Sequence, residues 1–226
     1  MLKREPIATA LVPGGGELTL VSHGRDFMIV LGRNELMSTR MRFSEEQLAE
    51  LTLARIGSTE PHLLIGGYGM GFTLRAALTK IGPQARVTVA ELVPEILDWA
   101  RGPMAELTGE SLDDPRLALE ICDVAALIDD GADGTSDGYD AILLDVDNGP
   151  DGLVRADNNR LYSRTGLARA RDALKSEGVL AIWSAARDPA FTRRLRDVRL
   201  EVEEVEVRAR PNNKGPRHTI WFAKRG

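Results

Sequence analysis

The chain has 226 residues, of which 29 are Lys or Arg and 34 are Asp or Glu, so its formal net charge at pH 7 is −5. Hydrophobic residues make up 43% of it, which is enough for a buried core and argues against disorder. The net acidity argues against a partner that is nucleic acid or a membrane surface, because both require a clustered positive field. The single cysteine, Cys122, excludes an intramolecular disulfide and a thiolate-based structural zinc site.

The first six residues lack the apolar stretch of a signal peptide, and no segment approaches the ~20 apolar residues that span a bilayer. We therefore expect a cytoplasmic protein without a membrane partner. His23, His62 and His218 are scattered without metal-ligand spacing, so we expect no metal site. The sequence does not decide whether the protein forms a homodimer.

The N-terminal segment alternates between apolar and polar residues. Residues 17–22, 26–31 and 35–38 predict three short strands of an antiparallel meander, separated by glycine and asparagine turns. Ser44 and Gln47 then have the spacing of a capping box, and apolar residues recur at helical intervals up to Gly57. We predict a small β appendage over residues 1–43 and a main domain over residues 44–226, which includes this helix.

From residue 62 onward, predicted strands alternate with predicted helices. This alternation is typical of βαβ units, so we predict an α/β, Rossmann-like fold with a mostly parallel sheet. Two final strands, 201–207 and 219–223, predict an antiparallel hairpin at its edge. The other expected strands are residues 62–65, 86–91, 117–122, 139–146 and 178–184, and the expected helices are residues 72–81, a helix that begins at Pro94, and residues 124–129, 165–174 and 189–197.

A glycine-rich loop, residues 66–71, lies between a predicted strand and a predicted helix. Its glycines let the backbone turn sharply and approach a ligand closely. The G-x-G-x-G spacing is looser than the G-x-G-x-x-G of dinucleotide folds and is typical of nucleoside-binding methyltransferase folds. A turn without a ligand is the alternative. We predict that the cofactor contacts Gly66, Gly67, Gly69 and Gly71.

Three carboxylates follow the ends of predicted strands. Glu91 comes 20 residues after the last loop glycine, where an acid can accept hydrogen bonds from both ribose hydroxyls. Asp123 can receive an adenine amino group, or it can cap the helix that follows. Asp145 would lie at the mouth of the crevice, where it could orient or deprotonate an amine. The alternative for Glu91 and Asp145 is a structural role at the strand end.

These residues resemble the spermidine/spermine synthase family over nearly the whole chain. The resemblance rests on Gly66-Gly67, on Val89-Ala90-Glu91, on Cys122-Asp123 and on the segment from Tyr139 to Asp145. It implies a small N-terminal β appendage that is followed in the sequence by a methyltransferase fold, with S-adenosylmethionine or its decarboxylated form as cofactor. It also implies that Glu91 binds the ribose, that Asp123 binds the adenine and that Asp145 activates the attacking amine.

The chain departs from this family in two places. The family usually has an aspartate inside the glycine loop, which holds the amine of decarboxylated S-adenosylmethionine, whereas this loop contains no acid. The family's polyamine-binding segment would fall on Glu45, Glu46 and Gln47, where its Tyr and His are missing. We expect Glu46 to contact the acceptor together with Asn148 and Tyr162, although a glutamate here can also be the solvated first turn of a helix.

The sequence thus predicts a group transferase with Asp145 as its catalytic residue and a small-molecule acceptor. Methyl transfer ranks first, because the acid of the loop is absent. Aminopropyl transfer from the decarboxylated cofactor to a polyamine is the alternative, and a catalytically silent nucleoside-binding scaffold is a second one.

Overall fold

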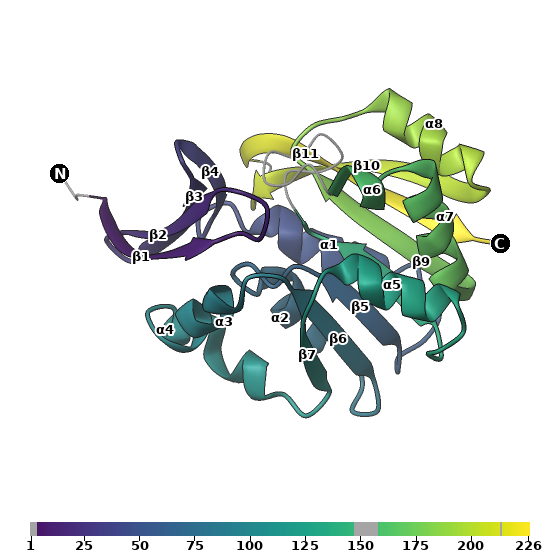
Figure 1. The fold of residues 1–226 in the computed structure, drawn as a ribbon, viewed down its shortest axis with the longest axis horizontal. Coiled ribbons are helices and arrows are strands. Elements are labelled where there is room, and N and C mark those ends of the chain that lie inside the picture. Colours follow the sequence, from purple (N-terminus) through teal and green to yellow (C-terminus); the bar gives the residue numbers. More distant parts are fainter. Residues whose placement is uncertain (1–3, 147–157, 213) are drawn as a thin grey trace.

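A computed structural model describes residues 4–146, 158–212 and 214–226, and it contains two β-sheets (Figure 1). The smaller sheet has four antiparallel strands in the order β1-β2-β3-β4. These are β1 (Glu5–Leu11), β2 (Glu17–His23), β3 (Asp26–Leu31) and β4 (Asn34–Ser38). The meander of β2, β3 and β4 confirms the predicted strands. Strand β1 was not predicted, because most of its side chains are exposed and its pairing register shifts after Pro6.

Helix α1 (Phe43–Leu53) connects the two sheets. The predicted capping box is wrong, because the residue that caps this helix is Arg42 and it makes no side-chain capping bond. Ser44 lies inside the first turn and is fully buried. Its hydroxyl donates to Oε2 of Glu45 at 3.0 Å.

The larger sheet has seven strands in the order β10-β11-β9-β8-β5-β6-β7. The five strands from β9 to β7 are parallel, and β11 and β10 add an antiparallel hairpin at one edge. This confirms the predicted α/β fold with its C-terminal hairpin. The strands are β5 (His62–Gly66), β6 (Arg86–Glu91), β7 (Leu117–Ile121), β8 (Tyr139–Leu144), β9 (Leu174–Ser184), β10 (Leu200–Arg210) and β11 (Lys214–Arg225).

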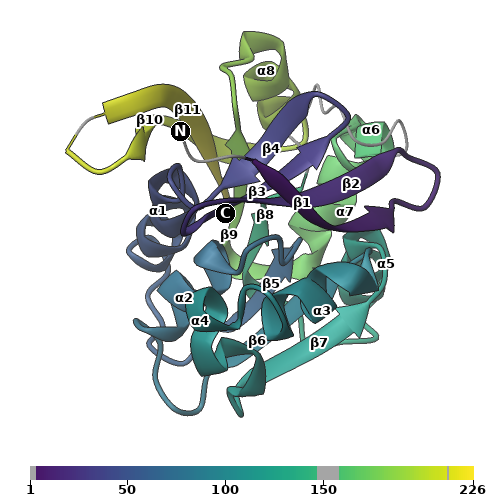
Figure 2. The ribbon, with the colours of Figure 1, turned by 90° about the vertical axis from the view of Figure 1, so that its left-hand side faces the viewer.

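Helices cover both faces of the larger sheet (Figure 2). Alternate residues of one strand supply two separate cores, so that Leu63 and Ile65 of β5 pack on one side and Leu64 on the other. The first core includes residues of α1, α2 (Phe72–Leu78) and α3 (Pro94–Arg101), and the second includes residues of α5 (Val124–Ala132), α7 (Arg164–Ala173) and α8 (Pro189–Asp197). Short helices α4 (Ala105–Thr108) and α6 (Asn158–Leu161) and a 3-10 helix (Gly109–Asp113) complete the fold.

The smaller sheet packs against the first core. Leu18, Leu20 and Ile29 join the apolar cluster that also contains residues of β5 and α3. This contact brings the four-stranded sheet over the carboxyl ends of the parallel strands (Figure 2). Among the described residues, no helix is long and apolar enough to cross a bilayer.

Candidate active site

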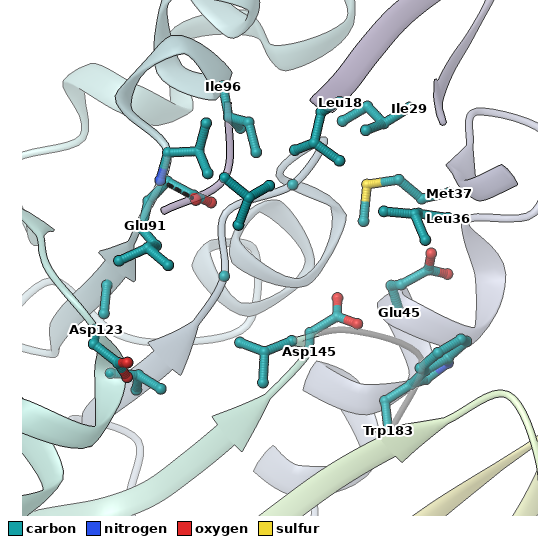
Figure 3. Close-up of a pocket in the computed structure, with 18 of the residues that line it drawn as sticks. Leu18, Ile29, Leu36, Met37, Glu45, Glu91, Ile96, Asp123, Asp145 and Trp183 are labelled. Carbon is teal, nitrogen blue, oxygen red and sulfur yellow. Dashed lines mark hydrogen bonds between the residues drawn. The ribbon is translucent and has the colours of Figure 1, made fainter. Parts of the chain in front are cut away.

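A pocket of about 150 Å³ lies between the smaller sheet and the carboxyl ends of the parallel strands (Figure 3). In open α/β sheets this end of the strands is the usual place for a ligand. The four-stranded sheet contributes an apolar wall formed by Leu18, Ile29, Leu36 and Met37. The polar lining comes from the larger sheet and its loops and from α1, and it comprises Glu45, Glu91, Asp123 and Asp145.

The glycine loop needs glycine at its first bend. Gly67 has a φ of +86°, and a Cβ atom added there would lie 2.8 Å from the carbonyl oxygen of Asp145. Its N–H donates to the carbonyl of Ala90 at 2.8 Å, which fixes the loop against β6. Gly67 and Gly69 line the pocket, whereas Gly66 packs against Leu144 and Val124.

Gly71 also shapes the loop. It precedes α2 with a φ of +71°, and a Cβ atom there would lie 2.7 Å from the hydroxyl of Tyr68. It is not among the described residues that line the pocket. Two of the four predicted cofactor glycines thus face the pocket, and the other two shape the turn.

Met37 covers the loop from the side of the smaller sheet. A Cβ atom added to Gly69 would lie 2.6 Å from the Cε of Met37 and 2.9 Å from its Sδ. A side chain on Gly69 would therefore require Met37 to move.

Glu91 ends β6 and is buried, with 5% of its surface exposed. One of its carboxylate oxygens accepts from the N–H of Tyr68 and the other from the N–H of Val93, both at 2.9 Å. Burial raises the pKa of Glu91, and these backbone donors oppose that rise. Glu91 thus anchors the glycine loop. Binding of the ribose by its carboxylate stays a prediction.

Asp123 follows β7 and caps α5, because its Oδ1 accepts from the N–H of Ala125 at 2.9 Å. This confirms the capping alternative. Asp123 also lines the pocket, near Glu91 and away from Asp145 (Figure 3). Binding of the adenine by its carboxylate stays a prediction.

Asp145 follows β8, and its carboxylate faces the other end of the pocket (Figure 3). Burial raises the pKa of Asp145 to about 6, against a hydrogen bond from Thr73 that lowers it. The Oγ1 atom of Thr73 lies 3.0 Å from Asp145 Oδ2 and 3.3 Å from the carbonyl oxygen of Glu45. Thr73 therefore connects Asp145 with helix α1.

Glu45 lines the pocket on the same side as Asp145. It is buried, with 5% of its surface exposed, and both carboxylates line the same end of the pocket (Figure 3). Burial first, and then the negative charge of Asp145, raise the pKa of Glu45 to about 8. Near neutral pH the two carboxylates therefore hold one proton between them.

The neighbouring Glu46 does not reach the pocket. It forms an ion pair with Arg42 at 2.8 Å and is not among the described residues that line the cavity. Successive residues of a helix point about 100° apart, so Glu45 and Glu46 cannot face the same side. The structure thus brings Glu45, rather than the predicted Glu46, to Asp145.

Tyr162 and Asn148 are the other two residues that were predicted to contact the acceptor. Tyr162 is buried, and its hydroxyl donates to the carbonyl of Val146 at 3.3 Å. Its ring packs edge-on against Phe191, and it is not among the described lining residues. Asn148 lies outside the described residues.

Several further residues around the pocket could not be found from the sequence. Trp183 is buried at the end of β9 and lines the cavity. Its ring packs against His218 of β11 with centroids 4.7 Å apart. The Nδ1 atom of His218 lies 2.9 Å from Oγ of Ser44, although the two residues are 174 positions apart. No local pattern could reveal that contact. Among the described residues, no cluster of His, Cys, Asp and Glu could hold a metal ion.

Comparison with solved structures identifies the fold. The chain superimposes on the spermidine synthase of Thermotoga maritima with a TM-score of 0.74 and 18% identity, over 98% of this chain and 72% of the other. A spermidine synthase in complex with the transition state analogue AdoDATO gives 0.73 and 18%, over 100% and 74%. The chain has the spermidine synthase fold. The predicted resemblance to the spermidine/spermine synthase family is confirmed.

Sequence relatives agree with this likeness, while no family model matches the chain. The chain is 30% identical over 139 residues to the polyamine aminopropyltransferase of Korarchaeum cryptofilum, covering 62% of this chain and 40% of that protein. It is 28% identical over 172 residues to the enzyme of that name from Mycobacterium tuberculosis H37Rv, covering 75% and 31%. The ribosomal RNA small subunit methyltransferase H of Halorhodospira halophila is 30% identical over 166 residues, covering 70% and 48%. The chain spans less than half the length of each of these relatives.

Proposed function

We propose that this chain transfers an aminopropyl group from decarboxylated S-adenosylmethionine to an amine acceptor. The charge of the pocket carries this proposal. The described lining residues include four carboxylates, those of Glu45, Glu91, Asp123 and Asp145. No Lys or Arg is among the described lining residues. The decarboxylated donor is purely cationic along its aminopropyl arm, whereas S-adenosylmethionine adds a carboxylate that these acids would repel.

The comparisons support the same choice. The relatives named polyamine aminopropyltransferases favour aminopropyl transfer over the methyl transfer that the sequence analysis ranked first. That ranking rested on the missing acid in the glycine loop. Glu45 and Asp145, which come from α1 and from the end of β8, offer acidic groups that the loop does not.

The residues of the pocket fit the two ends of such a donor. Glu91 and Asp123 would hold the ribose and the adenine, which leaves Asp145 and Glu45 beside the reacting carbon. When bound, the donor supplies an activated sulfonium carbon, which the amine nitrogen attacks while the carbon–sulfur bond breaks and its electron pair stays on sulfur. The protein mainly aligns the reactants, and such alignment can lower a barrier by roughly 7–11 kcal/mol.

Asp145 has the chemistry to act on the amine. An amine in water is protonated and must lose one proton before its nitrogen can attack. The carboxylate of Asp145 accepts that proton, and its raised pKa brings it closer to neutrality, where a general base is most effective.

Methyl transfer is the second candidate, because Met37 occupies the space over Gly69 where an acid for the donor's amine would have to fit. Calorimetry with each donor, followed by chromatography of the products, distinguishes the two candidates. We expect the decarboxylated donor to bind more tightly than S-adenosylmethionine. With 1,4-diaminobutane or another amine supplied as the acceptor, we expect methylthioadenosine to form. Formation of S-adenosylhomocysteine would instead indicate methyl transfer, and binding of neither donor would leave the silent scaffold.

A further inference from the structure

A series of hydrogen bonds leads from Glu45 through Ser44 to β11. The hydroxyl of Ser44 donates to Glu45 Oε2 at 3.0 Å, and Ser44 Oγ lies 2.9 Å from His218 Nδ1. Ser44 is fully buried, while His218 keeps 9% of its surface exposed and packs against the ring of Trp183. This series of hydrogen bonds thus begins at the pocket and ends at a histidine that keeps a small exposed surface.

Deprotonation of the amine requires a proton acceptor, and the series of hydrogen bonds through Ser44 can free one. Glu45 and Asp145 already hold one proton between them near neutral pH, because burial and their mutual repulsion disfavour two charges. A pair that already holds a proton takes up a second one poorly. The first proton therefore needs a way out before the ammonium can give up its own.

We propose that Ser44 and His218 form a proton outlet that carries the proton of Glu45 to solvent during each turnover. This inference rests on the proposed function. The Ser44 hydroxyl first turns from Glu45 toward His218. Protonated Glu45 then passes its proton to Ser44 Oγ, Ser44 passes its own hydroxyl proton to His218 Nδ1, and His218 releases its Nε2 proton to water. Proton exchange with water then returns His218 to its Nε2–H form for the next turnover. The ionised carboxylate pair then takes one proton from the ammonium. The net result is the movement of one proton from the amine to water, with no charge left in the protein.

The surroundings of each group suit this role. Burial first, and then the negative charges of Asp145 and Glu46, raise the pKa of Glu45 and favour its protonated form, against the hydrogen bond from Ser44, which lowers that pKa. His218 is neutral, because burial lowers its pKa to about 4. A neutral imidazole has one free ring nitrogen, so it can accept a proton at Nδ1 and release one from Nε2 without storing charge.

A structural role is the competing explanation, since the Ser44–His218 bond also joins α1 to β11. Two substitutions separate the explanations. Ser44→Ala removes the middle of this series of hydrogen bonds, and His218→Asn keeps a side-chain amide near the position of Nδ1 but cannot pass a proton through. His62→Asn is the matched control, because His62 also bonds through Nδ1, to the carbonyl of Gly138 at 2.9 Å, and also packs on an aromatic ring at 4.7 Å.

We expect Ser44→Ala and His218→Asn to lower kcat by about 10-fold to 100-fold, below the full effect of a general base. The KM for the amine and the donor Kd should stay within about twofold, and the solvent deuterium isotope effect on kcat should increase. Imidazole in solution should restore part of the rate of His218→Asn. The outlet is overturned if kcat is unchanged in both variants, or if it falls only as much as in His62→Asn, with no change in the isotope effect.

A second measurement separates this inference from the proposed function. The chain has three histidines, so 15N-histidine NMR gives three sets of ring signals, and His218→Asn identifies those of His218. In folded, donor-free protein, Glu45→Gln and Ser44→Ala should each shift the His218 Nδ1 signal, while His62→Asn leaves it in place. Unshifted signals in both variants would overturn the outlet even in an active enzyme. Failure to transfer an aminopropyl group, with the shifts present, would overturn only the function.

Discussion

Replacing Glu45 with Gln should stabilise the folded protein, although Glu45 lies in the proposed site. The wild-type carboxyl is buried beside Asp145, so folding favours its protonated form and raises its pKa from the ordinary 4.5 to about 8. The folded chain thus binds this proton more tightly than the unfolded chain does. The resulting stability is complete below about pH 4.5 and is lost as the pH rises through about 8.

The size of the effect follows from the two pKa values. Each pKa unit between the folded and unfolded states corresponds to about 1.4 kcal/mol, so ionised Glu45 lowers the free energy of unfolding by up to about 5 kcal/mol above pH 8. At pH 7 the same reasoning gives about 3 kcal/mol. A glutamine of the same shape carries no charge and avoids this cost.

Urea unfolding of both proteins between pH 5 and pH 9 measures the difference. The gain in unfolding free energy from Glu45→Gln should be small at pH 5 and should grow steadily toward pH 8. Glu46→Gln is the matched control, because Glu46 is paired with Arg42 near the surface, and its effect should stay within about 0.5 kcal/mol at every pH. A gain that does not vary with pH would refute the argument for a buried, proton-sharing pair.

Four further substitutions test the other three acids of the pocket. Asp145→Asn should lower the rate of transfer by roughly 10²–10⁴-fold in initial-rate assays, and unchanged turnover with the true acceptor would remove Asp145 from the chemistry. Glu91→Gln should weaken nucleoside binding by about 1.5–3 kcal/mol in calorimetry, and an unaltered Kd in folded protein would contradict a role at the ribose. Asp123→Ala should lower the free energy of unfolding by about 0.5–2 kcal/mol through loss of the helix cap. Asp123→Asn should retain the cap yet weaken nucleoside binding if the carboxylate meets the adenine, and equal affinity would restrict Asp123 to capping.

Much of the fold could be predicted because its signals are local. The strand Arg86–Glu91 and the helix Pro189–Asp197 have the bounds that the sequence predicted, since turn residues and a proline mark their ends. The alternation of strands and helices then determines a mostly parallel sheet. β1 was missed because an edge strand with exposed side chains has no apolar alternation to detect.

The candidate site was predictable only in part, for a geometric reason. Parallel strands end at the same edge of a sheet, so Glu91, Asp123 and Asp145 could be grouped from their positions after predicted strands. Whether Glu45 or Glu46 joins them depends on the exact start of α1, because one residue changes the direction by about 100°. The Ser44–His218 contact depends on how α1 packs against β11, which no short pattern encodes.

The wall formed by Leu18, Ile29, Leu36 and Met37 belongs to a different sheet from the strands that carry Glu91 and Asp145. The residues that shape this wall of the pocket and the residues that carry its acids therefore come from separate segments of the sequence. Changes to these four side chains would alter the length and width of the chamber offered to an acceptor, while the acids and the glycine loop stay where they are. Under the proposed function, a library confined to residues 17–38 is thus a direct route to variants that accept different amines.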